Sequence, residues 1–197
     1  MSEFLEPLIV GIGGTTREGS SSEKALRVAL NAAKRKGARI HLIAGEALDI
    51  PMYAPHLKHR SEKAVHLIEQ LSMCDGLIIS APAYHGSISG LIKNALDYVE
   101  DMRQGERVYL DDVPMGLIGC GAGWQGATQA LTHLRSIAHA LRAWPTPMGA
   151  VLNSSTPLFN DQGECIEPSA LSQLELVGEQ VAQFAKEKIN RVSELAN

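Results

Sequence analysis

The chain has 197 residues, of which 45% are hydrophobic and 20% are charged, and its formal net charge is −4. This composition is typical of a folded globular protein with a sizeable core, and it excludes an intrinsically disordered chain. The acidic balance argues against a nucleic-acid partner, and no apolar run is long enough to cross a bilayer.

The composition does not shift along the chain, so we expect residues 1–197 to form a single domain. The first residues, MSEFLEP, combine neither a cationic start nor an apolar stretch, which argues against a signal peptide. Cys74, Cys120 and Cys165 are odd in number and far apart, with no C-x-x-C pair. Cysteines used in this way fit a reducing compartment better than a disulfide framework, so a cytoplasmic location is expected.

Strand and helix patterns alternate from one end of the chain to the other. In chain order, they predict a strand over 7–13, a helix from about 23 to 37, a strand over 39–44, a helix over 61–73, a strand over 75–81, a helix over 89–101, a strand over 114–120, a helix over 126–141, a strand over 147–152 and a last helix after residue 168. The side chains expected to face the core from four of these helices are Leu26, Ala29, Leu30, Ala33, Ala64, Val65, Ile68, Leu71, Ile92, Ala95, Leu96, Val99, Leu174, Val177, Val181 and Phe184.

This alternation predicts an α/β fold with a parallel sheet that is covered by helices on both faces. Five strands with a phosphate-type loop after the first indicate a flavodoxin-like three-layer sandwich with strand order 2-1-3-4-5. In such sheets, ligands bind beyond the carboxyl ends of the strands near the point where the strand order reverses. We therefore expect the loops after strands one, three and four to build the site together.

The loop after the first strand, GIGGTTREGSSS over 11–22, has the composition of a phosphate-binding turn. A strand, a glycine-rich turn and a helix start direct backbone N–H groups and the helix dipole at one point. The Walker lysine position is Ser20, and the third glycine of the dinucleotide motif is replaced by Thr16. What remains suits a terminal monophosphate, and the candidate ligands are Thr15, Arg17, Ser20, Ser21 and Ser22. An alternative interpretation is that Ser20 only caps the helix, with Glu23 completing a capping box.

The loops after the third and fourth strands combine small residues with one large aromatic residue each. Their candidate cofactor-binding residues are Pro82, Ala83, Tyr84, His85, Gly86, Ser87, Gly121, Ala122, Gly123, Trp124 and Gln125. Glycines beside an aromatic side chain allow a flat ring to lie against the backbone, whose polar groups can read the edge of the ring. The alternative is that both segments are ordinary glycine-rich turns in which Trp124 fills a gap.

These segments resemble the NADPH-dependent FMN reductases of the flavodoxin-like superfamily, and the resemblance extends over nearly the whole chain. The family pattern P-x-Y…S…G-x-x-K-N-x-x-D is matched at Pro82, Tyr84, Ser87, Gly90, Lys93, Asn94 and Asp97. The resemblance implies that Thr15, Arg17, Ser20 and Ser22 hold the phosphate of FMN. It also implies that residues 82–87 border the isoalloxazine and that residues 121–125 close its pyrimidine side. The chain departs from many members at Gly14, Ala83 and His85.

The implied function is hydride transfer from NADPH or NADH to FMN and then reduction of a second acceptor, which would be a free flavin, a quinone, an azo compound or a metal oxyanion. A flavodoxin-type electron carrier and a flavin-binding regulatory protein without turnover are the alternatives. A homodimer or homotetramer is expected from the resemblance alone.

No side chain is assigned as a catalytic acid or base, because the cofactor would carry the chemistry. His85 could donate a proton to a reduced acceptor, although a hydrogen-bonded loop histidine is the preferred interpretation. No metal site is expected, because no carboxylate or thiol completes a set with His56, His59 and His66. A basic cluster of Lys58, Arg60 and Lys63 is interpreted as a solvated surface, with contact to the NADPH phosphate as the alternative, and Glu46 is likewise assigned to the surface.

Overall fold

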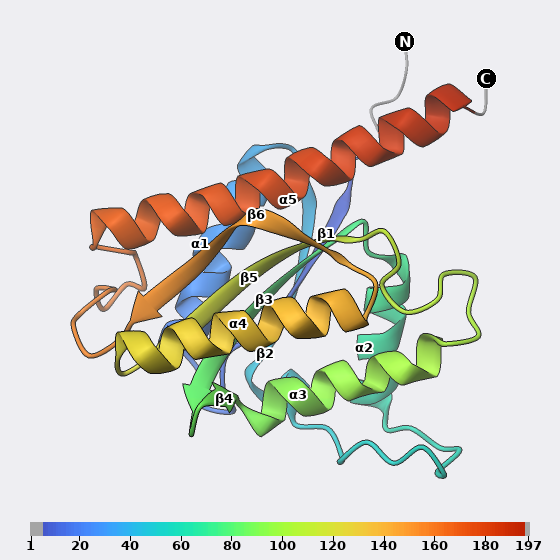
Figure 1. Ribbon diagram of the computed structural model, residues 1–197, viewed down its shortest axis with the longest axis horizontal. Helices are drawn as coiled ribbons and strands as arrows, with labels where there is room; N and C mark the ends of the chain where they lie inside the picture. Colours follow the sequence, from blue (N-terminus) through green and yellow to red (C-terminus); the bar gives the residue numbers. More distant parts are fainter. Residues whose placement is uncertain (1–5, 196–197) are drawn as a thin grey trace.

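The computed structural model describes residues 6–195 (Figure 1). Its strands are β1 (Leu8–Gly13), β2 (Arg39–Ala44), β3 (Gly76–Tyr84), β4 (Ser87–Ile88), β5 (Pro114–Gly121) and β6 (Trp144–Asn153). Its helices are α1 (Ser21–Arg35), α2 (Glu62–Met73), α3 (Gly90–Asp97), α4 (Trp124–Ala140) and α5 (Pro168–Leu195), with short 3-10 helices η1 (Gly45–Leu48) and η2 (Tyr98–Met102).

The five long strands form one parallel sheet in the order β2-β1-β3-β5-β6. This order confirms the predicted flavodoxin-like topology, because β4 lies off the main path and pairs only with β3 in antiparallel fashion. The chain moves outward from β1 to β2 and then crosses to β3 on the other side of β1. The order of the strands therefore reverses at β1 and β3, whose carboxyl ends flank a crevice in folds of this kind.

Helices cover both faces of the sheet, as predicted (Figure 1). On one face, Leu26 of α1 and Val177 of α5 are buried in a cluster with Ile9 and Ile78 of the sheet. On the other face, helices α2, α3 and α4 pack over a second cluster, which includes Leu67 of α2. Within residues 6–195, no helix has the length and apolar character needed to span a membrane.

Most of the predicted core residues are buried; Ile68 is partly buried, and two others are exposed. Val65 is 41% exposed, because α2 presents Ala64, Leu67 and Leu71 to the sheet and Val65 lies outside that stripe. Phe184 is 44% exposed, because α5 covers β6, which is the edge strand, so no further strand lies beyond that ring. Strand β6 also begins at Trp144, three residues before the predicted start.

The irregular segment between η1 and α2 is fixed to the body of the protein by one buried amide. Asn94 of α3 accepts a hydrogen bond from the backbone N–H of Tyr53 at 2.8 Å. Its Nδ2 atom donates to the carbonyl oxygens of Ile50 and Pro51 at 3.3 and 2.9 Å. Asn94, a residue of the matched motif, therefore holds a loop in place through three hydrogen bonds.

We expect Asn94→Ala to lower the free energy of unfolding by about 2 kcal/mol, because it removes three hydrogen bonds and leaves the Tyr53 N–H and the Ile50 carbonyl oxygen without the Asn94 partner. Urea denaturation followed by circular dichroism measures the change. The neighbouring Lys93→Ala is the control, since it removes only the exposed ion pair of Lys93 with Asp97 and should cost about 0.5 kcal/mol or less. Equal losses in the two variants would contradict the anchoring role of Asn94.

Two histidines meet where α2 packs beside the edge strand β2. The Nε2 atoms of His41 and His66 lie 3.1 Å apart, and the two rings are in an edge-to-face arrangement. Burial, and secondly the nearby charge of His66, lower the pKa of His41 from its usual value of 6.5. The folded state therefore resists protonation of His41 more strongly than the unfolded chain does.

A lowered pKa in the folded state means that the unfolded chain binds more protons as the pH falls below 6.5. The stabilising contribution is fully present above that pH, and it is lost as the pH falls toward the pKa of the folded state. We expect the free energy of unfolding to decrease from about pH 7 to about pH 5, and the decrease to be smaller in His66→Gln. Identical pH profiles of the variant and the wild type in urea titrations would rule out the coupling.

Candidate functional site

The first loop leaves β1 through a glycine that no other residue can replace without strain. Gly14 has a φ of +96°, and a Cβ atom at this position would lie 3.1 Å from the Cβ atom of Glu23. Its N–H group donates to the carbonyl oxygen of Ser80 in β3 at 3.3 Å. The loop is therefore pinned between β1 and β3, at the point where the strand order reverses.

Helix α1 begins with a capping arrangement that differs in one hydrogen bond from the capping box of Ser20 and Glu23. The Ser20 Oγ atom accepts a hydrogen bond from the Glu23 N–H at 3.3 Å, as predicted for a cap. The Glu23 carboxylate, however, accepts from the Gly19 N–H at 3.0 Å and not from the Ser20 N–H. The other carboxylate oxygen pairs with Arg27 at 2.7 Å, so this buried charge is fully engaged.

The remaining groups of the loop are arranged around its outer turn. The Thr15 Oγ1 atom contacts both the N–H and the carbonyl oxygen of Arg17 at 3.1 Å, which fixes the backbone there. The Ser20 and Ser22 hydroxyls are buried and lie 3.3 Å apart. The Arg17 side chain is exposed, and no acidic group between residues 6 and 195 pairs with its guanidinium. The loop therefore presents one unpaired cation beside a helix N-terminus, which is the chemistry of an anion site.

The segment predicted as a loop after the third strand is a tight hairpin. Strand β3 continues to Tyr84, and β4 returns beside it with Ala83 opposite Ile88 and Tyr84 opposite Ser87. His85 and Gly86 form the two-residue turn, with φ angles of +47° and +85°. Positive angles at both positions are those of a type I′ turn, whose second position favours glycine. His85 is exposed at the tip, and Tyr84 is 52% exposed beside it.

The third loop is held close to the hairpin by glycines. A Cβ atom on Gly121 would lie 3.0 Å from the backbone nitrogen of Ala127 and 3.2 Å from the Cβ atom of Ala83. Helix α4 begins directly after it at Trp124, whose side chain is 62% exposed. Because any side chain at position 121 would separate these segments, the close approach of β5, α4 and the hairpin depends on this glycine.

The structure therefore brings the three predicted loops to one edge of the sheet. A cavity of about 260 Å³ is shared by Thr15 and Thr16 of the first loop, Tyr84 of the hairpin, and Ser89, Gly90 and Leu91 at the start of α3. The third loop adjoins this cavity through the contact between Gly121 and Ala83. Ala122, Gly123 and Gln125 lie at the same edge, with Ala122 and Gln125 exposed.

Several neighbours of the site were not predicted from the sequence. Ser89 caps α3 by accepting from the Ile92 N–H at 3.3 Å, and this cap could have been predicted, because a serine precedes a helical pattern there. His133 of α4 lies with its Nδ1 atom 2.9 Å from the Ser87 Oγ atom. The backbone N–H of Ser154, after β6, donates to the Gly121 carbonyl oxygen at 2.7 Å. These last two contacts join distant segments, and no local pattern indicates them.

Two members of the basic cluster, Arg60 and Lys63, form structural contacts. Arg60 forms a two-point ion pair with Asp101 at 2.6 and 2.9 Å and lies over the rings of Tyr53 and Tyr98. Asp101, chiefly through this hydrogen bonding, keeps the pKa of the Arg60 guanidinium above its usual value. Lys63 pairs with Glu46 at 3.2 Å. In the described part of the chain, no group of three or more potential metal ligands gathers, and His66 pairs with His41 instead.

Comparison with known proteins identifies relatives of this arrangement. The family described as NADPH-dependent FMN reductase matches residues 7–157, which is well over half of the chain. An FMN-dependent NADPH-azoreductase of Staphylococcus aureus is 32% identical over 116 residues. That match covers 59% of this chain and 58% of the relative, so the chain spans less than two thirds of the relative's length.

Solved structures share the fold at lower identity. A flavoenzyme NAD(P)H:(acceptor) oxidoreductase from Paracoccus denitrificans superposes with a TM-score of 0.76 at 20% identity, covering 92% of this chain and 98% of that one. An apo NADH:FMN oxidoreductase superposes with a TM-score of 0.66 at 19% identity, covering 91% of this chain and 88% of that one. A flavodoxin from the Archaea also has the fold, with a TM-score of 0.61 at 11% identity and coverages of 91% and 99%.

Proposed function

The chain belongs to the NADPH-dependent FMN reductase family, and we propose that it is an FMN-dependent NAD(P)H oxidoreductase that passes electrons to a second, small-molecule acceptor. The observation that carries this proposal is the shared cavity between the Thr15–Thr16 turn and Tyr84. It lies at the carboxyl ends of β1 and β3, where the strand order reverses and where folds of this class bind their ligands.

The groups around this cavity fit a phosphate at one end. The unpaired guanidinium of Arg17, the hydroxyl of Thr15 and the N-terminus of α1 would hold the FMN phosphate. Ser20, Ser21 and Ser22 lie in the first turn of that helix or just before it. The Ser20 hydroxyl accepts the capping bond, and its own proton is available for donation when Ser22 is the donor in the bond between the two serines, so capping and phosphate binding are compatible.

The groups at the other end fit a flat ring. The hairpin from Pro82 to Ser87 would border the isoalloxazine, and the backbone from Gly121 to Gly123 would meet its polar edge. Ala83, where many family members have glutamate, leaves this shelf without a charge. Tyr84 and Trp124 are both more than half exposed and would flank the ring. FMN, when bound, would supply the redox chemistry, and these residues would bind and orient it.

The named relatives support this proposal and indicate which acceptor to test first. The Staphylococcus aureus relative is called an azoreductase, so an azo dye precedes quinones, free flavins and metal oxyanions in the order of assay. Both NADPH and NADH are proposed as reductants. We further propose a homodimer or homotetramer, to be measured by sedimentation, and a reducing cytoplasmic location, with which the three free cysteines are compatible.

The test is the visible absorption of the purified protein with FMN, before and after NADPH is added without oxygen. A reductase is expected to lose the flavin absorption within seconds, and adding an azo dye should restore it. Flavin that binds but keeps its colour would favour a carrier or regulatory protein. A failure to bind FMN at all would overturn the assignment of the three loops.

A further inference from the structure

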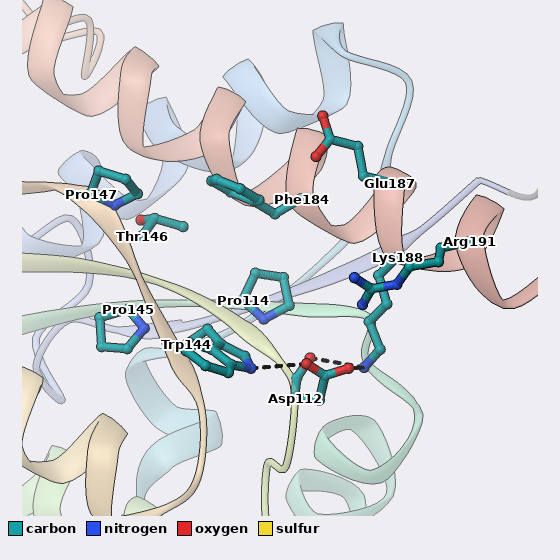
Figure 2. Close-up of a pocket in the computed structure, with 10 residues that line it drawn as sticks. All are labelled: Asp112, Pro114, Trp144, Pro145, Thr146, Pro147, Phe184, Glu187, Lys188 and Arg191. Atoms are coloured by element: carbon teal, nitrogen blue, oxygen red, sulfur yellow. Dashed lines mark hydrogen bonds and ion pairs between the residues drawn. The ribbon is translucent and has the colours of Figure 1, made fainter.

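A second hollow lies at the opposite end of the sheet, at the amino ends of β5 and β6. It has a volume of about 450 Å³ and lies between β6 and the C-terminal half of α5 (Figure 2). Its apolar walls are formed by Pro114, Trp144, Pro145, Pro147 and Phe184. Trp144 is 66% exposed and Phe184 is 44% exposed, so two large aromatic surfaces face the solvent across this groove. A volume of this size is that of a small-molecule site.

The groove lies beside the edge strand β6, but it is not suited to bind an additional β-strand. The N–H of Trp144 points inward and donates to the Val113 carbonyl oxygen, and beyond it the pairing of β6 with β5 is irregular over a stretch that includes positions 145 and 147. Both of these are prolines, which have no N–H group to offer. Farther along the strand, the N–H of Met148 is already bonded to Gln180 at 2.9 Å. The two prolines and the bonded N–H groups of Trp144 and Met148 therefore offer no backbone donors to an added strand, so we expect an occupant to bind through its ring and its polar substituents.

The charged side chains at the rim fall into two groups. Asp112 and Lys188 pair with each other, and Arg191 stands apart from them. Asp112 accepts from the Trp144 Nε1 atom at 2.9 Å, and Lys188 reaches its carboxylate at 3.3 Å and its carbonyl oxygen at 2.8 Å. These charges compensate each other (Figure 2).

Arg191, one turn farther along α5, lines the groove, and no acidic side chain in the described part of the chain pairs with it. Glu187 accepts from Gln183 at 2.9 Å, and its carboxylate points away from the hollow (Figure 2).

We propose that this groove binds a small planar aromatic anion, of the aromatic carboxylate class. The ring would contact Trp144, Phe184 and the prolines, and the carboxylate would pair with Arg191. The fixed orientation of the indole supports this assignment, because its bond to Asp112 holds Trp144 at the wall. The groove lies at the other end of the strands from the proposed FMN site, so the inference is independent of the proposed function.

The experiment is isothermal titration of 2-naphthoate into the purified full chain, with and without saturating FMN. Saturable binding is expected in both cases. Replacement of Arg191 by Gln should weaken the affinity by about tenfold, which corresponds to about 1.4 kcal/mol. The uncharged 2-naphthalenemethanol should show a comparable loss with the wild type. Arg39→Gln is the matched control and should change nothing, since Arg39 is also exposed and lies at the amino end of the other edge strand.

Three outcomes would overturn the proposal. The first is the absence of binding at about millimolar probe, a concentration that corresponds to only about 4 kcal/mol of affinity. The second is binding that Arg191→Gln leaves unchanged or that FMN abolishes, which would place the probe at the carboxyl end of the sheet. The third is sedimentation showing that Trp144→Ala dissociates an oligomer, which would make the groove an interface between copies of this chain.

Discussion

Replacing Arg17 by Gln is expected to weaken FMN binding by about ten- to a hundredfold. The guanidinium is exposed, it has no acidic partner in the described residues, and it lies on the phosphate-type loop. A hydrogen bond to a charged group contributes about 1.5–3 kcal/mol, and every 1.4 kcal/mol corresponds to about a tenfold change in affinity. Titration of flavin fluorescence with wild type and variant measures the two dissociation constants. Riboflavin, which lacks the phosphate, should bind both proteins equally.

Glu18→Gln is the matched control for this measurement. Glu18 is the exposed neighbour of Arg17 on the same loop, and its charge has the opposite sign. If the loop binds a phosphate, removing this negative charge should leave FMN affinity unchanged or raise it slightly. A loss of affinity in Glu18→Gln equal to that in Arg17→Gln would indicate that the substitutions disturb the loop, and it would remove the support for phosphate binding at Arg17.

The sheet could be predicted from the sequence because its signals are local and repeated. Buried parallel strands are apolar on both faces, so runs such as 8–13 and 76–81 stand out, and helices between them require parallel pairing. Strand β4 was missed because two residues carry no periodicity, and the evidence for it is the turn at His85 and Gly86. Only about a few per cent of non-glycine residues have a positive φ, and although histidine is enriched among them, a single histidine does not predict one, so the hairpin was interpreted as a loop.

Only the position of each loop of the candidate site could be predicted from the sequence, because each loop directly follows a predicted strand. Topology places the ends of β1, β3 and β5 together, which is why residues far apart in sequence gather at one edge. Contacts such as Ser87 with His133 depend on how α4 packs, and no spacing in the sequence encodes them. The same limit applies to Arg60, whose pairing with Asp101 makes it structural, whereas its sequence neighbourhood indicated only a basic surface.

The largest stability effect is expected at Gly178, where α5 packs directly against the backbone of α1. An alanine Cβ atom there would lie 1.9 Å from the carbonyl oxygen of Ala29 and 2.8 Å from its carbonyl carbon. Gly to Ala in a helix ordinarily stabilises it by about 1 kcal/mol, so propensity alone predicts the opposite sign. We expect Gly178→Ala to lower the free energy of unfolding by about 3 kcal/mol or more, measured by urea denaturation.

Two further variants distinguish this clash from a general weakness of α5. Ser172→Ala, on the exposed side of the same helix, should stay within about 0.5 kcal/mol of the wild type. Ala32→Gly removes the side-chain neighbour that lies 3.1 Å from the added Cβ atom, and it should fail to rescue Gly178→Ala. The decisive contact is with backbone atoms of Ala29, which no truncation of a side chain removes. Full rescue by Ala32→Gly would mean that the Ala32 side chain, and not the backbone of Ala29, is the decisive contact, and it would contradict this explanation.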